Sequence, residues 1–350
     1  MLMGSMAPCR GAELSALSAV LYDPLTEQVL FEKNGREVHS MASTTKIMTA
    51  LVALEIYDPE SWVEIRPEWT GIEGSSMYLK PGEQLQIIDL LYGLMLMSGN
   101  DAAAALAGML TGTEADFVSL MNRKAEELGL TDSSFANPHG LEEEGHYSTA
   151  FDLARLMAEA MENPIFREIT GTESCQRANR VMGNHNKLLR LYEGCIGGKT
   201  GYTRKAGRCL VTIAEREGRQ LIAVTMQAPD DWKDHATLYD SVFSRLERAE
   251  LCRRGIAAKI PLAGGGGCGV YADEEYSLAL LPGEMKKIKT EIHGARMIYG
   301  PANAGAHYGH LIVRMGEQVV FTTPLYYEKD IPAPQSASRW EAFCGWLRSR

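Results

Sequence analysis

Apolar residues recur at two different spacings along residues 18–251, which predict both strands and helices. Alternation over residues 18–33, with a turn at Asp23-Pro24, predicts a pair of strands, and residues 194–228 predict an antiparallel meander of three strands. Helical spacing predicts helices over residues 43–56, 86–97, 101–110, 114–128, 148–161 and 234–251. Because strands come from both ends of this region and helices from its middle, we expect an α+β fold in which helices flank an antiparallel sheet.

The pattern changes after residue 254. Short alternating segments separated by Gly and Pro turns predict a small all-β domain, followed by a Pro- and Ser-rich linker. In the last segment Trp340, Phe343, Cys344 and Leu347 have the spacing of one helix face. We therefore predict an N-terminal extension or cloning remnant, a main domain, a β-sandwich-like domain, and a linker with a terminal helix, over residues 1–14, 15–254, 255–330 and 331–350.

One apolar stretch, residues 90–110, is long enough to resemble a membrane span. The polar segment Ser98-Gly99-Asn100-Asp101 interrupts it at the centre. Two buried helices joined by a short polar break fit this pattern better than a span.

Charge and cysteine content narrow the classes of function. The net charge of -10 argues against a nucleic-acid partner, because binding to phosphate backbones depends on concentrated Lys and Arg. The one dense basic run, residues 204–208, is interpreted as a solvated turn. Seven cysteines without a C-x-x-C pair or a zinc spacing indicate mostly buried free thiols rather than a disulfide framework.

The helix predicted from residue 43 begins with the polar sequence Ser43-Thr44-Thr45-Lys46 and is otherwise apolar. Residues i and i+3 share one helix face, so the Ser43 hydroxyl and the Lys46 amine can meet there. Burial can lower a lysine pKa by up to about 3–5 units from about 10.4, which would let Lys46 accept the serine proton. The hypothesis is a serine nucleophile activated by a lysine base. The alternative is a hydroxyl cap followed by a lysine that reaches solvent.

Two further short motifs follow in order. Ser98-Gly99-Asn100 offers a second hydroxyl and a carboxamide, although a plain turn between helices gives the same pattern. Lys199-Thr200-Gly201 lies on a predicted strand after Gly197-Gly198, and these glycines would let a substrate backbone approach. An edge strand with a solubilising lysine is the alternative. The ordered trio matches the S-x-x-K, S-[DG]-N and K-T-G set of penicillin-binding proteins and serine β-lactamases.

Longer segments carry a closer resemblance, over about residues 15–250. The chain resembles the D-alanyl-D-alanine carboxypeptidases, the low-molecular-mass penicillin-binding proteins, in the segments MASTTKIMTALVALE, MYLKPGEQLQIIDLLYGLMLMSGNDAAAALA, GLTDSSFANPHGL, HYSTAFDLARLM and GGKTGYTRKAGRCLVT. This resemblance implies a β-lactamase/transpeptidase-like fold and a serine peptidase that needs no metal or organic cofactor.

The resemblance also implies roles for individual residues. Ser43 would attack the carbonyl between two terminal D-alanines, with Lys46 as general base. Ser98 and Asn100 would move protons and orient the peptide. The backbone N–H groups of Ser43 and Tyr202 would form the oxyanion hole. The residues expected to bind the substrate and its carboxylate are Lys199, Thr200, Gly201, Tyr202 and Thr203.

The implied partners are a peptidoglycan stem peptide that ends in D-Ala-D-Ala and, as inhibitors, β-lactam antibiotics. The family is exported, so the resemblance implies action at the outer face of the cytoplasmic membrane, although the N-terminus has no signal-peptide pattern. Residues 336–350 fit an interfacial membrane anchor, and equally a helix packed on the β domain.

Three alternatives remain open from the sequence. A class A-like β-lactamase shares the trio but usually has Asp in place of Gly99 and an E-x-x-L-N loop, and this chain has no Leu-Asn pair. An endopeptidase or transpeptidase would use the same scaffold. A penicillin-binding sensor or wall-binding protein would keep the nucleophile with slow or no turnover. Of the nearby polar residues, His139 is expected to be structural, and His185 and Asn186 to brace the site.

Overall fold

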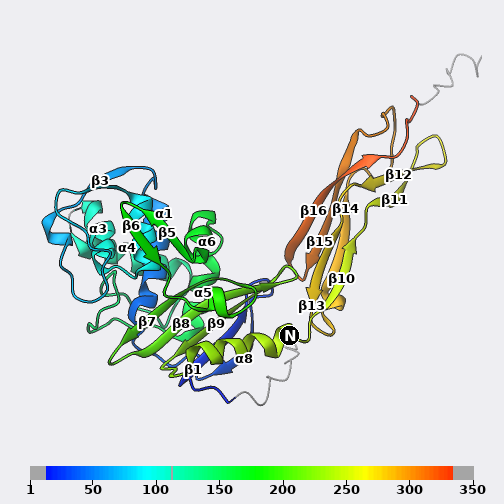
Figure 1. Ribbon diagram of the computed structural model, residues 1–350. Helices are drawn as coiled ribbons and strands as arrows, with labels where there is room; N and C mark the ends of the chain where they lie inside the picture. The colour runs from blue at the N-terminus through cyan, green and yellow to red at the C-terminus, as the bar shows by residue number, and fades with distance from the viewer. Residues whose placement is uncertain (1–12, 112, 334–350) are drawn as a thin grey trace, which may run out of the picture. The chain divides into compact units, whose positions relative to one another are not determined.

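The structure, a computed structural model, describes residues 13–111 and 113–333 (Figure 1). It divides the chain into two compact units, the first ending at Arg245 and the second starting at Leu246. Among the described residues, no helix has both the length and the apolar character needed to cross a membrane. The predicted terminal helix lies outside the described residues, as do Cys9 and Cys344.

A five-stranded antiparallel sheet forms the base of the first unit. Its strands are β1 (Ser18–Asp23), β2 (Gln28–Lys33), β7 (Cys195–Thr203), β8 (Gly207–Arg216) and β9 (Arg219–Met226). Their order is β2-β1-β9-β8-β7, so the predicted meander and the N-terminal strand pair join into one sheet. The strand β7 lies at one edge of this sheet.

Helices cover both faces of the sheet. The helices of the first unit are η1 (Ala42–Thr45), α1 (Lys46–Ile56), η2 (Pro67–Trp69), α2 (Ile87–Leu96), α3 (Asn100–Thr111), α4 (Glu114–Glu127), α5 (Ala150–Ala160), α6 (Pro164–Gly171), α7 (Leu188–Leu191) and α8 (Asp231–Phe243). Alternation along β8 explains the two layers. Val211 and Ile213 belong to the core shared with α5, whereas Thr212 between them contacts His235 and Tyr239 of α8.

Two helices of the first unit are buried on nearly every side, which explains their continuous apolar sequences. Every residue of α2 is buried, and so is α1 from Lys46 to Ala53. The polar break between α2 and α3 falls at Met97 to Gly99, where the sequence predicts it. The long apolar stretch is therefore two packed helices of a globular core.

Two small hairpins in the first unit are absent from the sequence prediction. They are β3 (Trp62–Glu64) with β4 (Gln84–Gln86) and β5 (Ser174–Arg177) with β6 (Arg180–Gly183). The second hairpin turns at Ala178 and Asn179, which both have positive φ. A two-residue turn of this kind matches the twist of the flanking strands.

The helix predicted over residues 234–251 is wrong from residue 244 onward. The helix α8 ends at Phe243, and Glu247–Cys252 forms the strand β10, paired with β13. The residues Glu247, Arg248 and Glu250 favour a helix locally, but pairing with a neighbouring strand decides the conformation. The boundary between the compact units accordingly falls before β10, whereas the sequence pattern predicts it after residue 254.

The second unit is built from strands. They are β10, β11 (Gly255–Pro261), β12 (Gly267–Ala272), β13 (Tyr276–Leu280), β14 (Ile288–His293), β15 (His307–Met315) and β16 (Gln318–Tyr327), with the short helix η3 (Glu284–Lys287). The order β11-β12-β16-β15-β14 forms one sheet and β10-β13 another. Apolar residues from both sheets share a core, which includes Cys252, Val270 and Leu325.

Candidate active site

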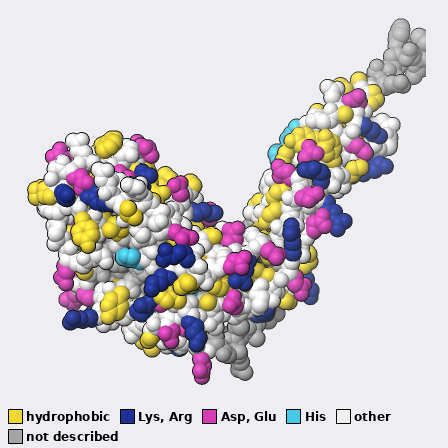
Figure 2. Space-filling model, viewed as in Figure 1, with side chains coloured by type: hydrophobic (Ala, Val, Ile, Leu, Met, Phe, Trp, Pro, Cys, Tyr) yellow, Lys and Arg dark blue, Asp and Glu magenta, His cyan; other side chains and the backbone are white. Residues whose placement is uncertain are grey.

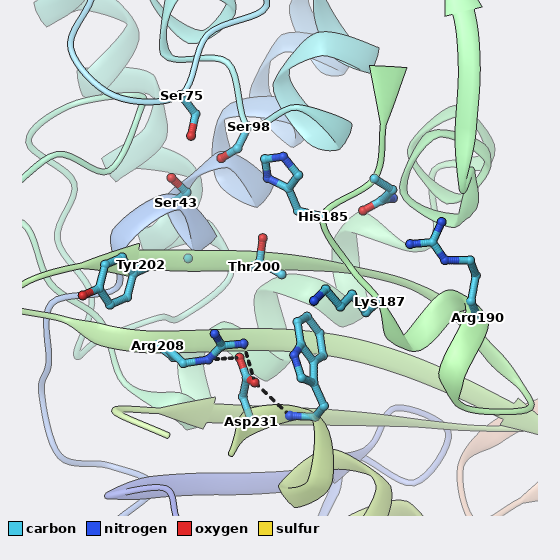
Figure 3. Close-up of a pocket in the computed structure, with 13 residues that line it drawn as sticks. Ser43, Ser75, Ser98, His185, Lys187, Arg190, Thr200, Tyr202, Arg208 and Asp231 are labelled. Atoms are coloured by element: carbon cyan, nitrogen blue, oxygen red, sulfur yellow. Dashed lines mark hydrogen bonds and ion pairs between the residues drawn. The ribbon is translucent and has the colours of Figure 1, made fainter. Parts of the chain in front are cut away.

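A pocket of about 480 Å³ opens on the first unit, where η1, the α2–α3 connection, β7 and α7 meet (Figure 3). Its lining residues are Ser43, Ser75, Ser98, Asn184, His185, Lys187, Arg190, Thr200, Gly201, Tyr202, Arg208, Asp231 and Trp232. Ser43, Ser98 and Thr200 come from the three predicted motifs. The fold therefore brings together segments that lie far apart in the sequence.

Beneath the pocket, Lys46 is completely buried at the start of α1. Its Nζ lies 3.1 Å from Ser43 Oγ, 2.7 Å from Asn100 Oδ1 and 2.5 Å from the His139 carbonyl oxygen. These three oxygens surround the amine. The one-turn offset between Ser43 and Lys46 thus produces the predicted contact between hydroxyl and amine.

Burial holds the pKa of Lys46 well below its ordinary value of 10.5. The nearby positive charge of Lys199 lowers this pKa further, and Asp101 opposes the shift. A neutral amine has two N–H donors and one lone pair. It can donate to Asn100 Oδ1 and the His139 carbonyl while its lone pair accepts the Ser43 hydroxyl proton.

The loop that supplies the His139 carbonyl is fixed against α1. Thr49 donates a hydrogen bond to the Pro138 carbonyl over 2.6 Å, and the Gly140 N–H donates to Asn137 Oδ1 over 2.7 Å. A side chain at Gly140 would collide with the Ala42 carbonyl. Burial lowers the pKa of the His139 ring to about 4, so this ring is neutral. Its backbone, not its imidazole, contacts Lys46, which agrees with a structural role.

The second motif places Ser98 on the pocket wall at positive φ, between α2 and α3. The buried Lys199 amine donates to Ser98 Oγ over 3.0 Å and to the Thr200 carbonyl over 2.9 Å. Burial lowers the pKa of Lys199 to about 7. Lys199 therefore lies behind the wall, and its charge reaches the pocket next to Ser98 and Thr200.

Gly201 of the third motif lies where the fold leaves no room for a side chain. A Cβ atom on Gly201 would lie 3.0 Å from the Ser43 nitrogen and 3.0 Å from the Met41 carbonyl oxygen. The edge strand β7 thus packs against the backbone of the η1 turn that carries Ser43. A larger residue would push the strand away from that turn.

The two glycines that precede this motif are closely packed within the fold. A Cβ on Gly197 would lie 2.6 Å from Thr170 Cγ2, and the Thr170 hydroxyl donates to the Gly198 carbonyl over 2.9 Å. Gly197 therefore admits the helix α6, whereas a Cβ on Gly198 would lie 2.6 Å from the Val211 carbonyl oxygen of β8. Contacts within the fold, with α6 at Gly197 and with β8 at Gly198, thus account for both glycines without a substrate.

The two residues after the third motif lie in different places. Tyr202 lines the pocket and is 67% exposed. The Thr203 hydroxyl instead donates to the Glu142 carboxylate and accepts the Ala206 N–H over 2.9 Å. Thr203 is not among the residues that line the pocket. Its side chain supports the β7–β8 turn.

Several charged residues of the pocket were not predicted from the sequence. Arg208 at the start of β8 forms two hydrogen bonds with the buried Asp231, of 3.0 Å and 2.7 Å, and its guanidinium lies 5.5 Å from the Trp232 ring centre (Figure 3). The prediction of a solvated turn was therefore wrong for Arg208. Lys187 and Arg190 also line the pocket, and their segment has no helical or strand periodicity that would have revealed them.

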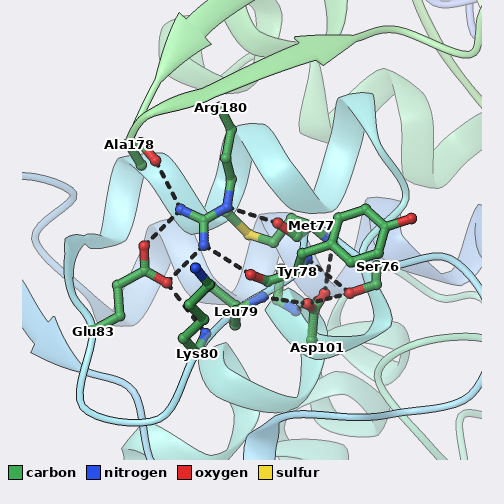
Figure 4. Close-up of polar contacts among 10 residues, drawn as sticks. Ser76, Met77, Tyr78, Leu79, Lys80, Glu83, Asp101, Ala178 and Arg180 are labelled. Carbon is green, nitrogen blue, oxygen red and sulfur yellow. Dashed lines mark hydrogen bonds and ion pairs between the residues drawn. The ribbon is translucent and has the colours of Figure 1, made fainter.

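A polar clamp holds the loop beside the pocket (Figure 4). The Asp101 carboxylate accepts hydrogen bonds from Ser76 Oγ, Met77 N and Leu79 N. From the other side Arg180 donates to the Met77 carbonyl over 2.7 Å and forms an ion pair of 2.6 Å with Glu83. The clamp fixes the backbone that continues into Ser75 on the pocket wall.

A protein-family model described as D-alanyl-D-alanine carboxypeptidase, Peptidase_S11, matches residues 5–230. The chain belongs to this family of serine peptidases. It is 35% identical over 341 residues to the D-alanyl-D-alanine carboxypeptidase DacF of Bacillus subtilis, which covers 92% of this chain and 88% of DacF.

Solved structures agree with this assignment. A D-alanyl-D-alanine carboxypeptidase from Mycobacterium tuberculosis H37Rv is 37% identical with a TM-score of 0.64, and the match covers 69% of this chain and 96% of that one. DacD from Francisella tularensis matches 95% of this chain with a TM-score of 0.67, at 24% identity, which shows the fold alone. The predicted fold class and the predicted D-alanyl-D-alanine carboxypeptidase family are confirmed.

Proposed function

We propose that this carboxypeptidase removes the terminal D-alanine from peptidoglycan stem peptides that end in D-Ala-D-Ala, through an acyl-enzyme on Ser43. One observation carries the proposal. The Ser43 hydroxyl lies 3.1 Å from a fully buried lysine amine whose pKa is strongly lowered by burial. A serine and a neutral amine at this distance form an activated nucleophile.

In the proposed acylation, neutral Lys46 accepts the Ser43 proton while Ser43 Oγ attacks the carbonyl of the penultimate D-alanine. The oxyanion would be held by the N–H groups of Ser43 and Tyr202. The close packing of Gly201 against the Ser43 nitrogen supports this arrangement, because it brings β7 beside the nucleophile. The carbon–nitrogen bond then breaks, and the leaving D-alanine takes a proton.

Ser98 and Lys199 are suited to the step in which the carbon–nitrogen bond breaks and the leaving D-alanine takes a proton. Ser98 is on the pocket wall and accepts a hydrogen bond from Lys199 Nζ, so it can pass a proton toward the leaving amine. The charge of Lys199, next to Thr200 on the wall, would attract the terminal carboxylate. Asn100 would position Lys46 through its 2.7 Å hydrogen bond. Water then hydrolyses the ester and restores Ser43.

The same chemistry would make the protein a target of β-lactams. Attack of Ser43 on the strained cyclic amide would form an ester, and the opened ring would remain attached and obstruct water. We place this reaction at the outer face of the cytoplasmic membrane, as the substrate requires. The proposed contact of residues 336–350 with the membrane would be tested by liposome co-sedimentation with and without that segment. Equal sedimentation of the two proteins would overturn it.

Release of D-alanine from diacetyl-Lys-D-Ala-D-Ala tests the proposed function. We expect release by the wild type and about a million-fold less by Ser43→Ala, as in other serine hydrolases that lose their nucleophile. Ser119→Ala is a matched control, because Ser119 lies exposed on α4. Equal release by wild type and Ser43→Ala would refute the nucleophile. A stable penicillin adduct without release from the peptide would favour a sensor.

A further inference from the structure

The proposed reaction gives the pocket a direction along β7. The reacting carbonyl would lie by Tyr202, and the carboxylate of the leaving D-alanine would lie by Thr200. Figure 3 shows Lys187 and Arg190 on the side of Thr200 that faces away from Tyr202. This part of the pocket, which we call the leaving-group arm, would face whatever follows the scissile bond.

The backbone of the leaving-group arm is firmly held. Two buried asparagines precede α7, and Asn184 Nδ2 donates to the carbonyls of Thr170 and Thr172 over 3.2 Å and 3.0 Å. Asn184 Oδ1 accepts the Asn186 N–H over 2.9 Å, and Asn186 Oδ1 accepts the Leu188 N–H over 3.1 Å. The chain therefore presents the side chains of residues 187 and 190 from a fixed position.

The two cations of this arm differ from Arg208, the third cation that lines the pocket. Arg208 is neutralised by Asp231, the one acidic residue among those that line the pocket. Within residues 13–111 and 113–333, no acidic side chain forms an ion pair with Lys187 or Arg190. Figure 2 shows both acidic and basic side chains distributed over the surface of each unit. The arm thus combines two uncompensated positive charges in a chain of net charge -10.

We propose that the leaving-group arm binds a second negative charge, so that the enzyme prefers substrates in which the residue after the scissile bond carries a side-chain carboxylate. This inference rests on the proposed function. The arginine fork and the lysine ammonium at positions 190 and 187 suit a carboxylate. The chemistry is unchanged: Ser43 Oγ bonds to the D-alanine carbonyl carbon, the carbon–nitrogen bond breaks, and an amino acid with two carboxylates leaves. Water then cleaves the ester.

Three peptides isolate the effect of this charge: diacetyl-Lys-D-Ala followed by D-Ala, D-Glu or D-Gln. D-Glu and D-Gln have nearly the same shape, so the ratio of their kcat/KM values measures the charge alone. We expect the wild type to cleave the D-Glu peptide about tenfold faster than the D-Gln peptide, in line with two partly solvated charge contacts. The ratio should fall to about one in the double variant Lys187→Ala/Arg190→Ala and decrease at high salt.

Arg123→Ala is the matched control, because Arg123 is an exposed cation on α4, away from the pocket. It should keep the wild-type ratio. Cleavage of the D-Ala peptide by every variant would show that the site is intact. A wild-type ratio of one or less, or an equal change in Arg123→Ala and the double variant, would overturn this inference and leave the proposed function standing. No cleavage of any of the three peptides by the wild type would defeat both.

Discussion

The two units of this chain differ in what they bury. The first unit encloses whole charged or titratable side chains, among them Lys46, Lys199 and His235. In the described part of the second unit, the buried polar residues are Glu284 and Thr323. Burying polar groups costs free energy unless each finds partners, so a core that keeps many of them serves more than stability. The contrast indicates that the chemistry belongs to the first unit.

Among the variants proposed to test this contrast, replacement of Lys46 should have the largest effect, and the effect should be on the acylation rate. In Lys46→Met the amine is lost, and acylation of Ser43 should fall by about ten-thousand-fold or more, because a general base contributes about 10²–10⁴ and Lys46 also positions the serine. Lys46→Arg should be equally inactive, since a guanidinium does not deprotonate. Stopped-flow acylation by a fluorescent penicillin measures this. Rates within tenfold of wild type in either variant would remove Lys46 from the mechanism.

A core substitution in the second unit should leave the chemistry intact. Leu325 is fully buried in the core of that unit, and Leu325→Ala should lower its free energy of unfolding by about 2–5 kcal/mol. Denaturant titration measures this change, and D-alanine release at low denaturant should keep its wild-type kcat. The Mycobacterium tuberculosis structure, matched over 96% of its length by 69% of this chain, shows that a shorter chain holds the fold. A loss of kcat in Leu325→Ala would contradict the claim that the chemistry belongs to the first unit.

Buried histidines should make stability depend on pH. Burial lowers the pKa of His146 to about 4 and that of His235 to about 3, from 6.5. Below about pH 6.5 these histidines bind protons in the unfolded chain but stay neutral in the folded chain. The stability that they contribute is therefore fully present above that pH and is lost as pH falls toward about 4. Each histidine should contribute on the order of 2 kcal/mol to this loss.

Denaturant unfolding between pH 7 and pH 5 would measure that slope. His146→Gln should flatten it, even if the variant is less stable at pH 7. His293→Gln serves as a control, because His293 is exposed in the second unit. An unchanged slope in His146→Gln would show that its ring is not held neutral.

Loss of the Lys199 charge above pH 7 should lower kcat/KM by less than replacement of Lys46 lowers acylation. Burial lowers the pKa of Lys199 to about 7, so its positive charge is present below that pH and disappears above it. For peptides with a terminal carboxylate, kcat/KM should therefore fall by about tenfold between pH 7 and pH 8.5. At saturating peptide, kcat should fall less, because a bound carboxylate keeps the lysine protonated. A kcat/KM that stays flat to pH 9 would contradict this.

Local sequence patterns predicted the parts of the site that depend on neighbouring residues. The contact between Ser43 and Lys46 follows from one helical turn, and the polar break at Ser98 follows from two apolar runs. The strand β7 follows from its place in the meander predicted over residues 194–228. The family resemblance then linked these three segments, which spacing alone does not place together.

The missed features depend on partners far away in the sequence. The ion pair of Arg208 with Asp231 depends on how β8 lies against the start of α8. Gly197 is needed because α6 packs against it, and the strand β10 forms because it pairs with β13. Lys187 precedes α7 and Arg190 lies within it, and this helix of four residues is too short to have a periodic signal. In each case a tertiary contact, rather than local propensity, decides the outcome.

The pH dependence of Ser43 acylation at saturating β-lactam tests the central claim most directly, because the bound carboxylate then keeps Lys199 charged. If Lys46 is a neutral base, the rate should rise through an apparent pKa well below 10.5 and then level off. A rate that keeps rising through about pH 10.5, as for an ordinary lysine, would contradict the account.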